Sequence, residues 1–361
     1  MAGLIDPRIA SLVARRLSGD GGVDASRLQE MQENLTRAVP RAEELVAEIS
    51  GIPAPPPVRW AMVGRGDWAE VNITGMSRLI APLERKLGSR LDSLPLPARL
   101  AQRTVVSAEV GAMLGYISRR VLGQYDALVP EEDLAAMSPW KRARLPAGGA
   151  SLYFVGPNMA ELQRKMDFVP EDFSLWVAVH EVTHRFQFAG VPWLRDRFYG
   201  LLQRYLDSVQ MDAKGFARRL AQAGRKVVSR SLEEDEKSPV YLLADENQRA
   251  ILDEMQALMA VVEGHGNFVM DAVSEDVIPS VKRMRHLFEK RREQTNLMQR
   301  VINYAIGLEM KLRQYEMGQR FCEMVVATGG HAALAHLWSD PANLPTLDEL
   351  RSPDKWLRRV A

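Results

Sequence analysis

Two histidines and a glutamate form the pattern in this sequence that is best suited to chemistry. His180 and His184 stand four positions apart, and Glu181 directly follows the first of them. On an α-helix this spacing places both imidazoles on one face, with Cβ atoms about 5–6 Å apart, so both can reach one metal ion. A catalytic zinc keeps one position for water and lowers its pKa to about 7, so a nearby carboxylate can take the water proton. The spacing predicts a Zn²⁺ site with Glu181 as general base.

The residues around this motif favour a helix over about residues 171–188. Pro170 is followed by the acidic Glu171 and Asp172, which suit the positive end of a helix dipole. Gly190 and Pro192 then end the periodic stretch. Two histidines in an apolar helix need a polar partner once they are buried, and a metal ion provides one.

A third ligand is expected on a later helix. Glu263 lies on an otherwise apolar stripe of the predicted helix 242–273, where an unpaired charge would be costly. His265 is the rival ligand, but it faces about 200° away from Glu263 on an ideal helix. Asn267 stands four residues after Glu263 and can accept a hydrogen bond from a ligating imidazole. We prefer Glu263 as the third ligand.

One large class of zinc peptidases is excluded by the residues that follow His184. The metzincin pattern requires glycine at position 187 and histidine at position 190, whereas this sequence has Gln187 and Gly190.

Other side chains are candidates for binding substrate. Arg119 and Arg120 close an apolar helix predicted over 98–123, and either can hold a substrate carboxylate; the alternative is an ion-paired helix end. Tyr315 can donate a hydrogen bond to the oxyanion of a tetrahedral intermediate, and His286 is a second candidate for that role.

Apolar residues recur at helical spacing through most of the chain, so the predicted fold is mainly α with a minor β element. The predicted strand is 150–155, which would be an edge strand that aligns an extended peptide. The predicted helices cover residues 27–49, 75–92, 98–123, 171–188, 194–206, 212–224, 242–273, 278–290 and 294–327.

The proline-rich stretch 51–57 cannot be helical and reads as a stiff connector. It predicts an N-terminal helical segment over 1–58 and a catalytic domain over 59–361, with one continuous domain as the alternative.

Composition and net charge exclude several other classes of protein function. The 361 residues carry a net charge of +1, which gives no general field for nucleic acid or an anionic membrane. No apolar run approaches the roughly 20 residues of a membrane span, and the N-terminus lacks a signal-peptide pattern, so we expect a cytoplasmic protein. The single cysteine, Cys322, excludes an intrachain disulfide, and no G-x-S-x-G, P-loop or G-x-G-x-x-G is present. The oligomeric state is not predictable from these features.

Longer runs resemble a known family. LWVAVHEVTHRFQFAGVPWLR (175–195), SRRVLGQYD (118–126), VVEGHGNFVMD (261–271) and GLEMKLRQYEMGQRF (307–321) are similar to zincin-like hydrolases of actinobacteria and relatives. Some members carry a label of association with deazaflavin-coenzyme biosynthesis, for which no residue here argues. The resemblance extends from Trp68 to Trp356. It implies a largely helical zincin-like fold, with His180, His184 and Glu263 as ligands and Glu181 as catalytic carboxylate.

The sequence therefore predicts a zinc-dependent hydrolase, most simply a metallopeptidase that acts on a peptide or small amide-type substrate. The alternative is a non-catalytic zinc protein in which the same helices form a binding or scaffold module. A closed shell of four protein ligands, including His265, would favour that alternative.

Overall fold

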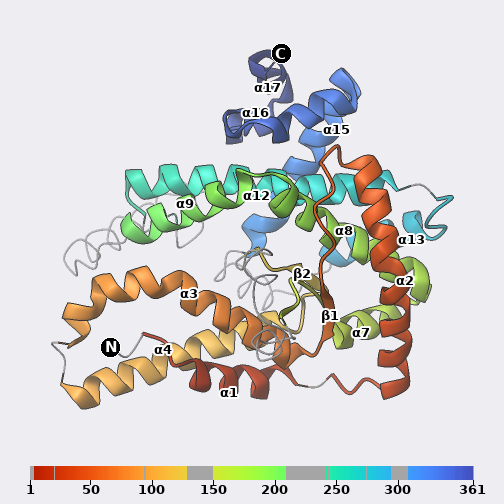
Figure 1. Ribbon diagram of the computed structural model, residues 1–361. Helices are drawn as coiled ribbons and strands as arrows, with labels where there is room; N and C mark the ends of the chain where they lie inside the picture. The colour runs from red at the N-terminus through yellow and green to blue at the C-terminus, as the bar shows by residue number, and fades with distance from the viewer. Residues whose placement is uncertain are drawn as a thin grey trace. The chain divides into compact units, whose positions relative to one another are not determined.

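The computed structural model describes residues 4–19, 21–92, 95–127, 149–208, 241, 244–273, 275–293 and 308–360 (Figure 1). This part of the chain is mostly helical and includes a small sheet, so the predicted fold class is confirmed. The principal elements are α1 (Pro7–Ser18), α2 (Ala25–Ile49), β1 (Trp60–Val63), α3 (Arg65–Asp92), α4 (Leu96–Ile117), β2 (Gly123–Tyr125), β3 (Leu152–Val155), α7 (Gly156–Met166), α8 (Pro170–Gly190), α9 (Leu194–Ser208), α12 (Glu246–Ala272), α13 (Val281–Glu293), α15 (Leu308–Ser339), η3 (Pro341–Asn343), α16 (Leu347–Arg351) and α17 (Pro353–Val360).

The chain divides into two compact units, each assembled from separate segments. Unit 1 is Met1–Leu45, Ala54–Arg185 and Ile278–Ser280; unit 2 is Val46–Pro53, Phe186–Val277 and Val281–Ala361. Helix α8 is continuous through the point where the chain passes from unit 1 to unit 2. The division into domains 1–58 and 59–361 stays a prediction.

The sheet belongs to unit 1 and has the strand order β1-β3-β2. β1 pairs parallel with β3, and β2 pairs antiparallel with it on the other side. All four residues of β3 are buried. The expectation that 150–155 forms an edge strand is therefore wrong, because both sides of β3 are occupied. The strand itself was predicted, whereas β1 and β2 were not.

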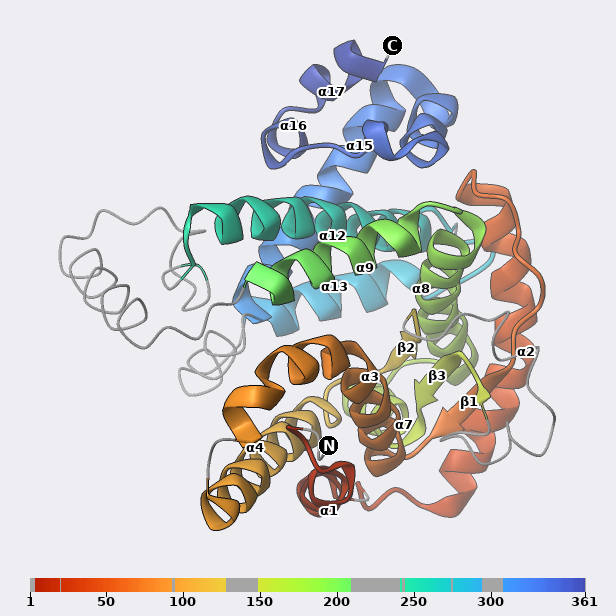
Figure 2. The same ribbon diagram turned by 60° about the vertical axis from the view of Figure 1, so that its left-hand side comes forward.

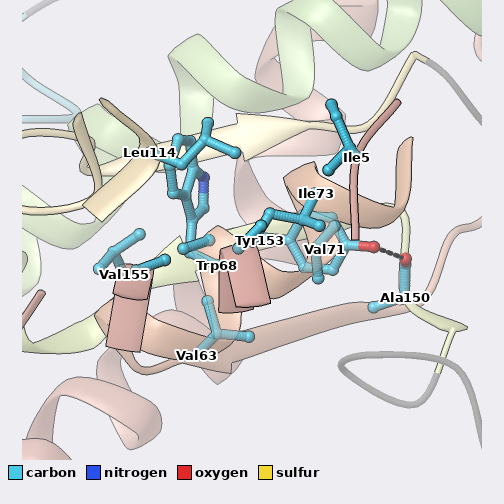
Figure 3. Packing of buried hydrophobic residues seen from close by; sticks show 12 residues of the cluster. Ile5, Val63, Trp68, Val71, Ile73, Leu114, Ala150, Tyr153 and Val155 are labelled. Atoms are coloured by element: carbon cyan, nitrogen blue, oxygen red, sulfur yellow. Dashed lines mark hydrogen bonds between the residues drawn. The ribbon is translucent and has the colours of Figure 1, made fainter. Parts of the chain in front are cut away.

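An apolar core lies between the sheet and the helices of unit 1 (Figure 3). Trp68 and Ile73 of α3 belong to the same buried cluster as Tyr153 and Val155 of β3. The Tyr153 hydroxyl donates a hydrogen bond to the Ala150 carbonyl, and burial raises the pKa of this phenol above its usual range. This core fixes α3 against the sheet.

Helix α1 packs along α4 through small residues (Figure 2). A Cβ added at Gly115 would lie 2.9 Å from the Ala14 carbonyl oxygen, and one added at Gly111 would meet the carbonyl of Ala10. Any larger side chain at either glycine would push the two helices apart.

Unit 2 is built around α12, which packs against α9 and α15. A capping box at Asp245 and Gln248 starts α12. At Gly264, a Cβ would collide with the backbone of Gly318 and Gln319 on α15. Because both helices lack a side chain at this contact, neither can turn about its axis without a clash.

Helix boundaries differ from the predicted ones mainly at turns. α4 ends at Ile117 instead of residue 123, and α3 begins ten residues before the predicted start at 75. The predicted helix 212–224 lies outside the described residues, as does the first part of the predicted helix 294–327. None of the helices in the described parts of the chain has both the length and the apolar character needed to cross a membrane.

Candidate metal centre

The HExxH residues lie in the second half of α8, a helix whose apolar side chains are nearly all buried. Phe173, Val179 and Val182 have no more than 1% of their surface exposed. Thr183 turns its hydroxyl back to the Val179 carbonyl at 2.7 Å and so satisfies its own buried polar group. Packing on several sides holds this helix in place, which fixes the direction of any functional side chain that it carries.

His180 and His184 converge on one point. Their Nε2 atoms are 3.1 Å apart, and the two rings meet edge to face with centroids 4.6 Å apart. Two nitrogens bound to a tetrahedral zinc at about 2.0–2.1 Å would be about 3.3 Å apart. The observed separation therefore fits two imidazole ligands of one zinc ion. Both side chains keep partial exposure, so solvent can reach this point.

Glu181 is 7% exposed and lies against the terminal strand β2. A Cβ added at Gly123 would lie 2.5 Å from Glu181 Cγ and 2.9 Å from its Oε1. The backbone of β2 thus packs directly on the carboxylate, and only glycine leaves room for it. The sequence gives no sign of this contact, since Gly123 stands at the end of the helix predicted over 98–123.

Gly123→Ala should displace the Glu181 carboxylate and lower any hydrolytic activity by about 10- to 100-fold, since small misplacements of catalytic groups have effects of this size. The added methyl should also cost about 1–3 kcal/mol of stability. Activity, zinc content and thermal unfolding of the variant check this. Gly200→Ala is the matched control, because a Cβ there meets nothing within 4 Å. Full activity in Gly123→Ala would contradict the assigned contact.

Helix α12 of unit 2 carries the other predicted ligands. Glu263 is partly exposed, Asn267 is 7% exposed and His265 is fully buried. The Gln187 amide nitrogen donates to the Val262 carbonyl at 2.9 Å and lies 3.1 Å from His265 Nδ1. An amide nitrogen only donates, so His265 Nδ1 accepts and this nitrogen carries no proton. Glu263 belongs to unit 2, whereas His180 and His184 belong to unit 1, so the role of Glu263 as third ligand stays a prediction.

Comparison with known proteins gives the family. The model of the family described as "Zincin-like metallopeptidase" matches residues 5–357. The chain belongs to the zincin-like metallopeptidase family. A crystal structure titled as that of "a putative hydrolase with a novel fold", from Chloroflexus aurantiacus, is 30% identical, with a TM-score of 0.67 and 98% of each chain covered. A search of curated proteins finds no match.

The predicted substrate residues of this zincin-like chain lie in a turn between α4 and β2. Arg119 is exposed. Arg120 donates to the Tyr116 carbonyl at 3.0 Å, and its guanidinium lies 3.6 Å from the Tyr116 ring centroid. A cation held over an aromatic face is already stabilised within the protein. The role of either arginine in holding a substrate carboxylate stays a prediction.

The two candidates for oxyanion binding lie on α15 and α13. Tyr315 lies on α15, but its side chain is outside the described residues. His286 is an exposed residue of α13. Neither role is tested, and both remain predictions.

Cys322 is fully buried in α15, and burial raises the pKa of its thiol far above the usual range. A thiol that stays protonated is a poor nucleophile, which argues against cysteine chemistry in this zincin-like protein. We expect iodoacetamide to leave Cys322 unmodified in the native protein and to label it fully after unfolding, as measured by intact-mass spectrometry. Rapid native labelling would contradict the buried position.

Proposed function

We propose that this chain is a zinc-dependent metallopeptidase in which His180, His184 and Glu263 hold the metal and Glu181 is the general base. The observation that carries the proposal is the convergence of the two imidazole Nε2 atoms beside a buried carboxylate on the same helix. Two nitrogen ligands with one carboxylate ligand are the donor set of many catalytic zinc sites, and this set leaves a position open.

The choice of Glu263 is supported by the path of α8. His180, His184 and Gln187 are spaced by four and three residues, so they share one face of this continuous helix. Gln187 in turn binds α12 at Val262 and His265, the residues on either side of Glu263. Because Nδ1 accepts this bond, a neutral His265 carries its ring proton on Nε2, and neither nitrogen has a lone pair for zinc. This argues against a closed shell of four ligands that includes His265, and so against the scaffold alternative.

The chemistry follows from the positions of the chain's own groups. When bound, zinc supplies Lewis-acid polarisation of a carbonyl and lowers the pKa of water. The Glu181 carboxylate accepts a proton from the attacking water and returns it to the leaving nitrogen, the role of a general base and then a general acid. Partial burial beneath β2 shields this carboxylate from bulk solvent, which strengthens its interaction with developing charge.

An extended peptide is the substrate shape that the sheet favours. β2 is a terminal strand of the described sheet and packs on Glu181 through Gly123. A peptide that pairs with the outer edge of such a strand has its backbone fixed by main-chain hydrogen bonds. This pairing would bring a scissile amide toward Glu181, so we propose a peptide substrate or a small amide of similar shape.

The test begins with elemental analysis of the purified full chain, followed by incubation with a mixed-sequence peptide library and mass spectrometry of the products. We expect about one zinc per chain and cleavage that stops with 1,10-phenanthroline and returns with added zinc. Cleavage that persists after the metal is removed, or a chain that binds no zinc, would overturn the proposal.

A further inference from the structure

The side chain of a buried asparagine forms hydrogen bonds with the turn that precedes β2. Asn158, near the start of α7, is 5% exposed. Its side-chain nitrogen donates to two carbonyls of this turn, those of Ser118 at 2.7 Å and Val121 at 2.6 Å. The next carbonyl, that of Leu122, accepts from the Val155 amide of β3 at 2.8 Å. The turn 118–122 is therefore held at three carbonyls by groups from outside it.

A buried arginine fixes the orientation of that asparagine. Arg65, the first residue of α3, is 6% exposed, and its Nε donates to Asn158 Oδ1 at 2.6 Å. Since a guanidinium nitrogen only donates, the amide oxygen must face Arg65 and the amide nitrogen must face the turn. Glu161 accepts from Arg65 Nη2 at 2.6 Å, and Lys165 first and Arg65 second hold the pKa of this carboxyl below its usual value. The charge of Arg65 is thus compensated.

The turn 118–122 sets the position of Gly123. This residue follows Leu122 directly, and its backbone touches the Glu181 side chain closely enough that a Cβ would lie 2.5 Å from Glu181 Cγ. Any displacement of the turn therefore changes the space in which the Glu181 carboxylate lies. The other face of β2 is held by a reciprocal amide pair between Asn72 and Gln124, at 3.1 Å in both directions.

We propose that Asn158 and Arg65 are positioning residues for Glu181: they hold the turn 118–122, and through it Gly123, against the catalytic carboxylate. The proposal rests on the proposed function of Glu181 as general base. A buried, fully bonded network of this kind can hold a group to within a fraction of an ångström, and misplacement by 1 Å can lower a rate by about 100-fold.

The test compares Asn158→Asp with Ser107→Ala in the full-length, zinc-loaded chain. Asp has the shape of Asn but cannot donate to Ser118 and Val121 when ionised. Ser107 is the matched control: it is fully buried in unit 1, and its hydroxyl accepts from the Asp6 amide at 2.7 Å in the contact of α1 with α4. Removing it should cost stability without moving the turn.

Two readouts separate positioning from general destabilisation. The first is kcat and KM on one quenched-fluorescence peptide chosen from the library products. The second is the carboxyl ¹³C resonance of Glu181 at fixed pH, in protein labelled at glutamate and assigned by its loss in Glu181→Gln. This resonance reports the surroundings of the carboxylate whether or not any peptide is cleaved.

For Asn158→Asp we expect kcat to fall by about 10- to 100-fold with KM within about twofold, unchanged zinc content and a shifted Glu181 resonance. Ser107→Ala should keep the wild-type kcat and resonance. An unmoved resonance in Asn158→Asp, or an equal loss of kcat in both variants, would overturn the positioning role. If wild-type protein cleaves nothing, the proposed function fails and the resonance still decides the positioning. If Asn158→Asp does not fold, Arg65→Lys, which keeps the cation but loses the Nε donor, should move the same resonance.

Discussion

Replacing Glu181 with Gln is expected to lower kcat for peptide hydrolysis by about 10²- to 10⁴-fold while zinc content stays unchanged, because a general base contributes rate enhancements of this size. Gln has nearly the same shape as Glu, so the packing against Gly123 is preserved. What it loses is the capacity to accept a proton from water. The proposed metal ligands His180 and His184 are untouched, so metal binding is expected to survive.

Steady-state kinetics and elemental analysis on the same preparation measure this effect. Arg164→Gln, on α7, serves as a control for preparation and zinc loading, since it lies outside the proposed centre. Activity of Glu181→Gln within about tenfold of wild type would refute Glu181 as the base. Loss of zinc together with activity would instead mean that this carboxylate contributes to holding the metal.

Glu263→Ala is expected to abolish stoichiometric zinc binding and, with it, all hydrolysis. Two histidines alone make an incomplete site, because catalytic zinc requires three protein ligands. His265→Ala should keep about one zinc per chain, because Nδ1 of His265 accepts from Gln187 and Nε2 then carries the ring proton. It should nonetheless destabilise the fold by about 2–5 kcal/mol, as for other large-to-small changes in a packed core.

Competition with a chromophoric chelator gives the zinc affinity of both variants, and thermal unfolding separates loss of a ligand from loss of the fold. Glu254→Gln is the matched carboxylate control: it is on the same helix, in surface ion pairs with Arg197 and Arg204. Wild-type zinc affinity in Glu263→Ala would remove Glu263 from the site. Loss of zinc in a folded His265→Ala would restore His265 as the rival ligand.

Elements whose residue pattern repeats over many positions could be predicted from the sequence. The helix that carries His180 and His184 was predicted to within two residues at each end, because its acidic start and its Gly190 end are local signals. Glu263 is a candidate ligand because a charge on an apolar helical face is visible in the spacing alone, and its role stays a prediction. The mainly helical class followed from the same periodicity.

Features that depend on partners far away in the chain were not predictable. β2 has only three residues, too few to show a strand period, and its glycine resembled the end of a helix. Its contact with Glu181 joins residues 58 positions apart. The central place of β3 required knowledge that β1 pairs with it, which no local signal carries. In the sequence, Gln187 argues against the metzincin class of peptidases. Its hydrogen bonds to Val262 and His265 are visible only in the structure.

The glycine contact between α12 and α15 would affect how the metal-free protein takes up zinc. Because Gly264 meets the backbone of Gly318 with no side chain between them, the packing of the two helices sets the rotation of α12 and so the helix face on which the neighbouring Glu263 lies. The position of this helix face does not depend on a bound ion. The metal-free protein would then stay folded and would bind zinc again without refolding. The free zinc concentration of its surroundings would set the fraction of molecules that carry zinc.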